Sequence, residues 1–254
     1  RMNRRLLITG AGGFLGSRIC EYFSGRDGYE AVGVTHRELD IEDFVAVSAF
    51  VKAIRPDYVL HCAAISNTGV CERNPVLSEK VNVRGTVNLA KACRKAGSRM
   101  IFTSSDQIYN TSHSLEPNRE GSEGKPGNVY GRDKKRAEEA MLTYLPDAVA
   151  LRLTWLYDAP SRGRVAGQGL LQKLTDALKE RREVEFPVHD YRGITYVWEV
   201  VRHLEEAMGL PGGVYNFGSE NRYNTFDTAR LFLRELAGSD SGSILKCNDE
   251  RFAS

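Results

Sequence analysis

Tyr130 and Lys134 stand four residues apart, a spacing that places two side chains one above the other on a single helix face. A tyrosine phenol has a pKa of about 10 and is a poor proton donor and acceptor at neutral pH. A lysine ammonium beside it favours the phenolate and lowers that pKa. The pair therefore predicts a general acid/base and the cation that tunes it, and the ammonium can also bond ribose hydroxyls.

Ser105 adds a hydroxyl to this pair. It lies near the end of the predicted strand at residues 99–106, where it can hydrogen-bond a substrate oxygen. A Tyr-x-x-x-Lys pair alone is common by chance. Combined with the strand-terminal serine and the glycine turn described next, it favours a catalytic trio of Ser105, Tyr130 and Lys134 over a purely structural helix.

A glycine-rich turn near the N-terminus follows the apolar run at residues 6–8 and precedes a segment with helical spacing. Strand, turn and helix in this order are typical of a dinucleotide-binding βαβ unit, whose helix N-terminus attracts phosphates. Gly10 lets the chain leave the strand, Gly13 lacks the Cβ that would hold a pyrophosphate away, and Gly16 lets the helix pack closely. An ordinary loop is the alternative. The residues expected to contact the cofactor here are Gly10, Gly13, Phe14, Leu15 and Gly16.

The end of the second predicted strand, residues 31–34, should lie against the adenosine ribose. A carboxylate there would favour NAD, but the residues at the tip are His36 and Arg37. These cations suit a 2′-phosphate and favour NADP, with NAD as the alternative cofactor. If Arg37 has no role in binding, it is a solvated loop residue. Asp40 can accept from the adenine amino group while Ile41 packs on the ring. Alternatively, Asp40 is the N-cap of the next helix.

The third predicted strand runs into Cys62, Ala63 and Ala64, whose small side chains let a flat cofactor lie close. Ser66 follows in a polar loop at the sheet edge where such folds bind ligands, so we expect it on the substrate side. His61 is interpreted as a packed or hydrogen-bonded histidine rather than a catalyst.

Asn82 lies near the start of a helix predicted over residues 79–96, which ends at Gly97. It either ties backbone together at the active site or faces the surface. The segment at residues 110–128, rich in Ser, Gly, Pro, Asn and Glu, is expected to be a long surface loop.

The fold class predicted from these elements is α/β, a Rossmann-type doubly wound parallel sheet with a small C-terminal substrate lobe. Residues 1–157 are assigned to the NAD(P)-binding domain and residues 158–254 mostly to the lobe, with some segments returning to the main sheet. Further elements are predicted at residues 170–179 (helix), 184–186 (strand), 196–208 (helix), 213–217 (strand) and 225–236 (helix). A polar tail follows Gly238.

The bulk properties narrow the choice of function. The chain has 254 residues, enough for one large α/β domain, and its net charge of +2 gives no reason to expect nucleic acid. No run approaches the ~20 apolar residues of a membrane span, and no signal peptide is recognised. The five cysteines are scattered without a C-x-x-C pair, so neither a disulfide framework nor a metal site is expected. A cytoplasmic protein is the resulting prediction.

The chain resembles the extended short-chain dehydrogenases/reductases, and within them the dTDP-4-dehydrorhamnose reductases and their relatives. The similarity covers residues 5–236 and is carried by the segments at residues 9–16, 38–41, 54–57, 62–64, 81–82, 128–131 and 151–157. It implies hydride transfer between NADPH and the C4 keto group of a nucleotide-linked deoxysugar. In that reaction Tyr130 would protonate the developing alkoxide, Lys134 would hold the ribose, and Ser105 would polarise the carbonyl.

The resemblance also assigns Asp106, Gln107, Trp155 and Arg192 to the substrate side, Arg192 either meeting a diphosphate or lying at the surface. The chain departs from the family at Ser105-Asp106-Gln107, where the reductases commonly show Thr-Asp-Tyr, so Gln107 removes an aromatic ring.

Two other functions stay open at this point. One is a sugar-nucleotide epimerase, which keeps its cofactor throughout; a dehydratase is disfavoured because Gln107 cannot serve as its base. The other is a non-catalytic NADP-binding regulatory subunit, like a relative that serves methionine adenosyltransferase. The resemblance implies a homodimer as the possible assembly.

Overall fold

The computed structural model describes residues 3–112, 116–159, 163–167, 169–238 and 244–249. The chain divides into two compact units. Unit 1 comprises Arg1–Leu153 and Val201–Phe217, and unit 2 comprises Thr154–Val200 and Gly218–Ser254.

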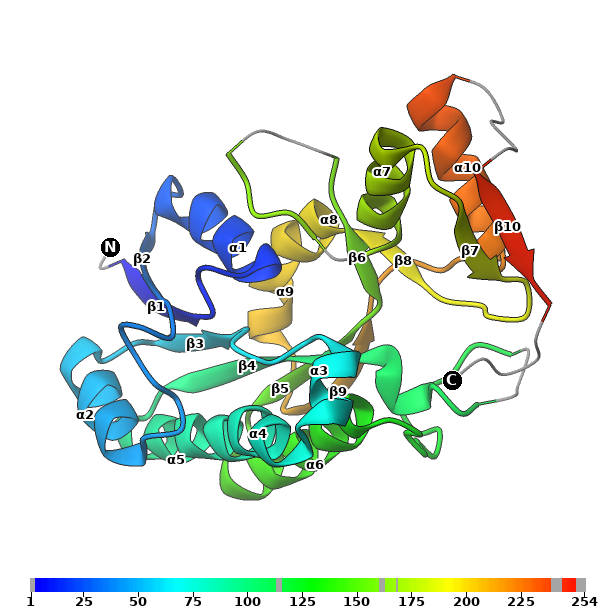
Figure 1. Ribbon diagram of the computed structural model, residues 1–254. Helices are drawn as coiled ribbons and strands as arrows, with labels where there is room; N and C mark the ends of the chain where they lie inside the picture. The colour runs from blue at the N-terminus through cyan, green and yellow to red at the C-terminus, as the bar shows by residue number, and fades with distance from the viewer. Residues whose placement is uncertain (1–2, 113–115, 160–162, 168, 239–243, 250–254) are drawn as a thin grey trace. The chain divides into compact units, whose positions relative to one another are not determined.

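Unit 1 is built on a six-stranded sheet in which every strand pair is parallel, in the order β2-β1-β3-β4-β5-β9 (Figure 1). Its strands are near-continuous apolar runs, as expected for a sheet that helices cover on both faces. The non-sequential order confirms the predicted doubly wound architecture. The strands are β1 (Arg4–Thr9), β2 (Tyr29–Val34), β3 (Tyr58–His61), β4 (Arg99–Ser105), β5 (Val149–Leu153) and β9 (Gly213–Phe217).

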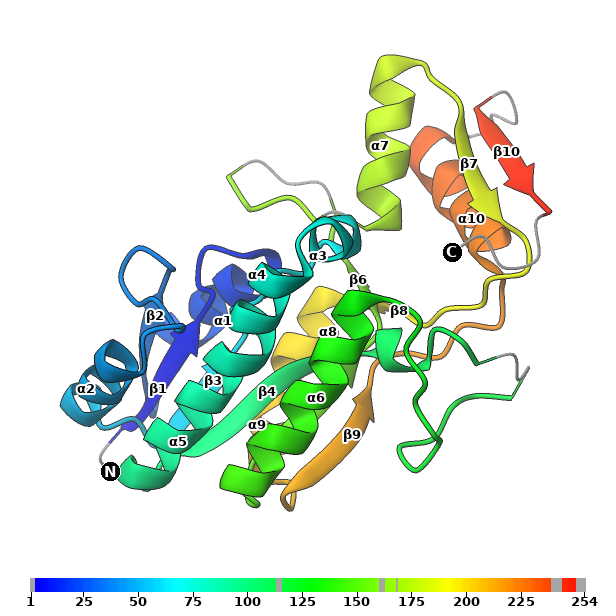
Figure 2. The same ribbon diagram turned by 60° about the horizontal axis from the view of Figure 1, so that its bottom comes forward.

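Helices lie on both faces of this sheet. In Figure 2, α2 (Phe44–Ile54), α5 (Thr86–Ala96) and α6 (Val129–Tyr144) cover one face, and Figure 1 shows α1 (Phe14–Ser24) and α9 (Leu204–Gly209) on the other. The main core lies beneath α2, α5 and α6. Its fully buried members include Val47, Val51, Leu89, Met100 and Met141. This packing fixes α6, the helix that carries Tyr130 and Lys134, against the end of β4.

The helix predicted over residues 79–96 is more complex than its apolar spacing indicated. It consists of α4 (Pro75–Glu79), a π-helical turn η1 (Lys80–Gly85) and α5, preceded by the short α3 (Thr68–Arg73). The helix predicted over residues 196–208 is broken at His203 into α8 (Val197–Arg202) and α9. Hydrophobic periodicity does not detect either irregularity.

Asp43, and not Asp40, is the N-cap of α2. The Asp43 carboxylate accepts hydrogen bonds from the backbone N–H groups of Val45 and Ala46 at 2.9 and 3.0 Å. Asp40 instead accepts from the N–H of Glu42 at 2.9 Å. The capping alternative for Asp40 is therefore wrong.

Unit 2 contains two small parallel sheets. One pairs β6 (Trp155–Tyr157) with β8 (Ile194–Tyr196), and the other pairs β7 (Val184–Pro187) with β10 (Leu245–Asn248). A core between α7 (Leu170–Glu180) and α10 (Thr225–Ala237) packs on the second sheet. Strand β10 lies in the segment interpreted as a polar tail, because exposed Lys246 and Cys247 hide its strand pattern. Among the described residues, no helix has the length and apolar character needed to cross a membrane.

Candidate active site

The glycine turn at the end of β1 is held against the end of β3. Gly10 has φ +71°, and a Cβ added to it would lie 2.7 Å from the backbone nitrogen of Ala63. A side chain is therefore excluded at this position by both conformation and space. A Cβ at Gly16 would collide with the carbonyl oxygen of Gly10. Gly16 thus lets α1 pack closely on the turn itself, rather than on the sheet as expected.

The N-terminus of α1 fits a pyrophosphate. Its N-cap is Gly13, no side chain caps it, and its first turn carries no acidic residue. Backbone N–H groups of that turn, which includes Phe14 and Leu15, can therefore donate to an anion, helped by the helix dipole. A glycine-rich turn followed by a helix whose N-terminus no side chain caps is the arrangement that binds a dinucleotide pyrophosphate in such folds.

The tip of β2 carries a carboxylate that sequence reasoning missed. His36 and Arg37 are exposed there as expected, but the Glu38 carboxylate folds back and accepts from Thr35 N–H at 2.7 Å and Thr35 Oγ1 at 2.9 Å. These hydrogen bonds hold the pKa of Glu38 below its ordinary value. The spacing of Thr35 and Glu38, three residues apart as in a capping box, was the available signal.

Ile41 and Asp40 differ in their surroundings. Ile41 is buried, and it contacts Gly85, where an added Cβ would come within 2.6 Å of its Cδ1. Asp40 is exposed, and its carboxylate lies 3.9 Å from the His36 ring. Only Asp40 is therefore freely accessible from solvent.

The loop after β3 is tied down by Asn82, which the structure places in the interior. The Asn82 side chain donates to the carbonyl of Ile65 at 3.1 Å and accepts from the N–H of Ile65 at 2.9 Å. The loop's neighbours Cys62, Ala63 and Ala64 are half-buried, and Ser66 is exposed. Burial raises the pKa of the Cys62 thiol to about 12, so this cysteine is not a nucleophile.

His61 is fully buried and neutral. Its Nδ1 lies 2.7 Å from Thr9 Oγ1, and its Nε2 lies 3.0 Å from Thr86 Oγ1. The Thr86 hydroxyl donates its proton to the carbonyl of Asn82 at 2.7 Å, so it accepts from an N–H on Nε2. Burial, with the charge of Lys134, lowers the pKa of His61 to about 3. The ring is therefore an internal connector between β1 and α5.

Ser105, Tyr130 and Lys134 converge at the carboxyl end of β4. Tyr130 is 9 % exposed, and burial raises its pKa above the ordinary value despite a hydrogen bond with Ser105 that lowers it. This result differs from the expectation that lysine would lower the pKa. The Lys134 Nζ instead donates to the carbonyl of Thr103 at 2.8 Å and lies 5.7 Å from the centre of the Tyr130 ring. Tyr130 is consequently a protonated phenol at neutral pH.

Burial also lowers the pKa of Lys134, to about 8. Its ammonium lies 4.5 Å from the centre of the Phe102 ring, a favourable cation–π contact. Lysine thus remains mainly charged at neutral pH while close to titration.

Asp106 and Gln107 lie directly beside the trio. The Ser105 hydroxyl lies 3.4 Å from the Asp106 carboxylate and accepts from the backbone N–H of Gln107 at 3.2 Å. The Gln107 side chain accepts from the Asn128 amide at 2.8 Å, and Asn128 is the N-cap of α6. Gln107 therefore links the end of β4 to the start of the helix that carries Tyr130.

Trp155 and Arg192 belong to unit 2 and are close to each other. The Arg192 guanidinium lies 5.1 Å from the centre of the Trp155 ring, and its Nε lies 3.7 Å from the Asp190 carboxylate. The Lys173 ammonium lies 5.6 Å from the same ring. An aromatic ring flanked by two cations is a suitable surface for an anionic ligand.

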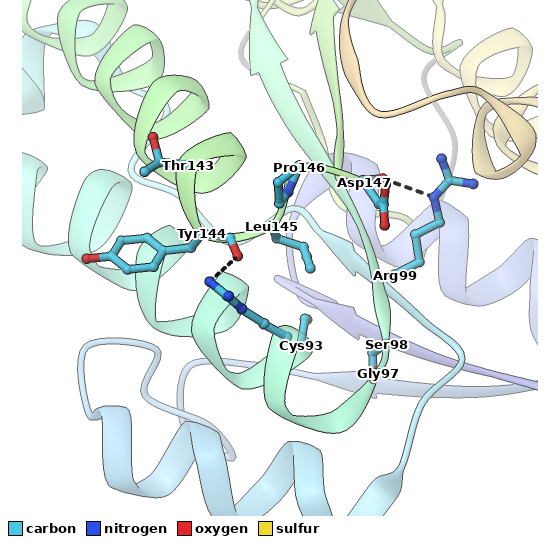
Figure 3. A pocket seen from close by; sticks show the side chains of 10 residues that line it. Cys93, Gly97, Ser98, Arg99, Thr143, Tyr144, Leu145, Pro146 and Asp147 are labelled. Atoms are coloured by element: carbon cyan, nitrogen blue, oxygen red, sulfur yellow. Dashed lines mark hydrogen bonds between the residues drawn. The ribbon is translucent and has the colours of Figure 1, made fainter.

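A depression of about 510 Å³ lies at the amino end of β4 in the unit 1 sheet, at the opposite end of this strand from Ser105 (Figure 3). Its polar donors are engaged with backbone: Arg99 donates to the carbonyl of Asp147 at 3.1 Å, and Arg94 to that of Tyr144 at 3.4 Å. Ser105 lies at the other end of β4. The depression is therefore separate from the candidate active site. It is lined by Cys93, Arg94, Gly97, Ser98, Arg99, Thr143, Tyr144, Leu145, Pro146 and Asp147.

A doubly wound parallel sheet with this glycine turn defines the class of dinucleotide-binding proteins. The family model described as the RmlD substrate binding domain matches residues 4–253. The chain belongs to this family, one of the extended short-chain dehydrogenases/reductases, which confirms the resemblance inferred from its motifs.

Characterised relatives agree with this assignment. A dTDP-4-dehydrorhamnose reductase of Mycolicibacterium smegmatis is 30% identical over 98% of this chain and 74% of its own length. A dTDP-4-keto-6-deoxy-D-glucose reductase of Streptomyces niveus is 31% identical over 99% of this chain and 85% of its own. Methionine adenosyltransferase 2 subunit beta of Xenopus laevis is 33% identical over 89% of this chain and 70% of its own length.

Solved structures confirm the fold. A dTDP-4-dehydrorhamnose reductase of Bacillus anthracis in complex with NADP superimposes with a TM-score of 0.85 at 24% identity, covering 98% of this chain and 84% of that one. A Thermus thermophilus UDP-glucose 4-epimerase in complex with NAD gives a TM-score of 0.79 at 26% identity, covering 96% of this chain and 85% of that one.

Proposed function

We propose that this chain is an NADPH-dependent reductase of a nucleotide-linked 4-keto deoxysugar. The observation that carries the proposal is the convergence of Ser105 with Tyr130 and Lys134 at the carboxyl end of β4, where the buried Tyr130 phenol keeps its proton. A protonated acid is what carbonyl reduction needs, because the alkoxide that develops must receive a proton. The names of the reductase relatives support the same substrate class.

In the proposed mechanism each member of the trio has one task. The Ser105 hydroxyl polarises the sugar carbonyl, and Tyr130 gives its phenolic proton to the oxygen at C4. Lys134, already charged beside Phe102, exchanges its bond to Thr103 for the ribose hydroxyls and stabilises the phenolate that remains. When bound, NADPH supplies the hydride.

Gly10, Gly13, Gly16 and the N-terminus of α1 would hold the pyrophosphate, as the uncapped helix allows. His36 and Arg37 would meet the 2′-phosphate, and Glu38 competes by offering a negative charge at the same tip. NADP is therefore the proposed cofactor. NAD is the form bound in the epimerase from Thermus thermophilus.

The experiment is to mix the purified protein with NADPH and dTDP-4-dehydrorhamnose or dTDP-4-keto-6-deoxyglucose. Loss of reduced-nicotinamide absorbance, stoichiometric with sugar reduced, supports the reductase. Tyr130→Phe serves as the inactive control.

Two other outcomes would support the alternatives. Interconversion of nucleotide sugars that carry a C4 hydroxyl, with oxidised cofactor and no net change in it, would indicate an epimerase. Tight NADPH binding without turnover of any nucleotide sugar would indicate a regulatory subunit; the Xenopus laevis relative is named as a subunit of methionine adenosyltransferase 2. The intact Ser105, Tyr130 and Lys134 favour catalysis.

A further inference from the structure

Asp133 is a buried carboxylate on α6 that the proposed chemistry does not use. It lies between Tyr130 and Lys134 in the sequence and is 3 % exposed. Carboxylates are almost never buried without a partner. The main partner is Ser78 on α4, also fully buried, whose hydroxyl donates to Asp133 Oδ2 at 2.6 Å. The exposed Arg136 contributes a weaker contact at 3.8 Å from Oδ1.

Ser78 passes the connection on to Asn82. The Asn82 Nδ2 donates to Ser78 Oγ at 3.2 Å and to the carbonyl of Ile65 at 3.1 Å. The Asn82 Oδ1 accepts from the N–H of Ile65 at 2.9 Å. A continuous buried chain of hydrogen bonds therefore runs from Asp133 on the catalytic helix to both backbone groups of Ile65.

The far end of this chain is the loop between β3 and α3. Ile65 lies between Ala64, predicted to line the cofactor site, and Ser66, predicted to face the substrate. Its side chain packs with Cys71, Val129 and Tyr130. The loop thus meets α6 twice, through an apolar contact at Tyr130 and through the polar chain that ends at Asp133.

The π-helical turn η1 is part of the same chain of hydrogen bonds. It contains Asn82, and the carbonyl of Asn82 accepts from Thr86 at 2.7 Å. π-Turns inside α-helices occur frequently at functional sites. Here the turn holds Asn82 in the interior, where its amide reaches Ser78 and Ile65 together.

We propose that Asp133 is a positioning residue: through Ser78 and Asn82 it fixes the Ala64–Ser66 loop relative to the Tyr130–Lys134 face of α6. The inference rests on the proposed function for the identity of the reacting groups. Loss of the link should free the loop and misplace the substrate carbonyl relative to the Tyr130 hydroxyl, so kcat falls while the affinity for NADPH changes little.

The test compares Asp133→Ala, Ser78→Ala, the double variant and Asp133→Asn with the wild-type protein. Hydrogen exchange of the Ile65 amide is measured without ligands, and kcat and KM are measured with NADPH and the nucleotide sugar. Thr143→Ala is the matched control, because that hydroxyl also lies on α6 and, among the residues that the structure describes, bonds only to the carbonyl of Glu139 in the same helix.

In Asp133→Ala and Ser78→Ala we expect Ile65 to exchange about tenfold faster and kcat to fall about tenfold. The double variant should be no worse than either single one, because both remove one shared link. Asp133→Asn keeps an oxygen that accepts from Ser78 and should restore most of the protection and of kcat. Thr143→Ala should behave as wild type.

Wild-type exchange at Ile65 in both single variants would overturn the proposal, as would faster exchange with unchanged kcat. If Asp133→Ala fails to fold, Ser78→Ala and Asp133→Asn decide the result. A wild-type protein without turnover would contradict the proposed function instead, and the exchange measurement would still decide whether the link orders the loop.

Discussion

The Nζ of Lys134 donates a hydrogen bond to the backbone carbonyl of Thr103 at 2.8 Å, from a position that is 2 % exposed. One hydrogen bond and the Phe102 ring compensate the charge only partly, which is why burial lowers its pKa to about 8. In the proposed mechanism this ammonium exchanges its carbonyl partner for the ribose hydroxyls.

Lys134 should make the stability of the fold depend on pH. Between about 8 and the ordinary value of 10.5, the folded Lys134 has lost its proton while the unfolded one keeps it. The unfolded state then binds more protons, so this residue makes the free energy of unfolding rise with pH across that window, by about 3 kcal/mol. Urea unfolding should show that Lys134→Met lacks this rise. Lys52→Met, at an exposed lysine of α2, should retain it. An equal rise in Lys134→Met would refute the assignment.

Tyr130→Phe should lower kcat by about 10²–10⁴-fold, because the variant has no proton to give to the alkoxide. The affinity for NADPH, measured by fluorescence titration, should remain close to that of the wild type. Tyr144→Phe, at the other end of α6, is the control and should keep its activity. Normal turnover by Tyr130→Phe would show that another group supplies the proton.

Gly10→Ala and Gly97→Ala separate two costs of adding a Cβ. Both glycines have φ near +70°, but only Gly10 faces backbone at 2.7 Å, whereas nothing lies within 4 Å of a Cβ at Gly97. Gly97→Ala should lose about 1–2 kcal/mol of unfolding free energy, the cost of the left-handed conformation alone. Gly10→Ala should lose more and should bind NADPH poorly. Equal losses in thermal or urea unfolding would contradict the close approach of Gly10 to Ala63.

The tip of β2 should set the choice between the two dinucleotides. Arg37→Ala should weaken NADPH binding about tenfold, which corresponds to about 1.4 kcal/mol, and leave NADH binding nearly unchanged. Glu38→Gln should shift the preference further toward NADPH, because it removes the negative charge near the 2′-phosphate. Dissociation constants for both cofactors give the ratio. A ratio that neither substitution moves would place the ribose elsewhere.

Sequence patterns predicted the sheet well because its strands contain short apolar runs, and Gly10 and Gly97 mark the turns beside β1 and β4. The Tyr130–Lys134 pair was equally accessible, since its spacing is that of a helix face. Two features could not be predicted, for physical reasons. The π-turn at Asn82 leaves the apolar pattern unchanged, and Asp133 resembles a surface residue until its partner Ser78 is known. The return of Glu38 to Thr35 was overlooked, although the three-residue spacing indicated it.

The most direct test of the reductase is to supply NADPH with deuterium at both C4 positions of the nicotinamide ring together with a dTDP-4-keto-6-deoxysugar. The product sugar should carry one deuterium at C4, should form in equal amount with NADP⁺, and can be detected by mass spectrometry and NMR. A converted sugar without deuterium and without NADP⁺, or no conversion of any such sugar, would contradict the proposed function.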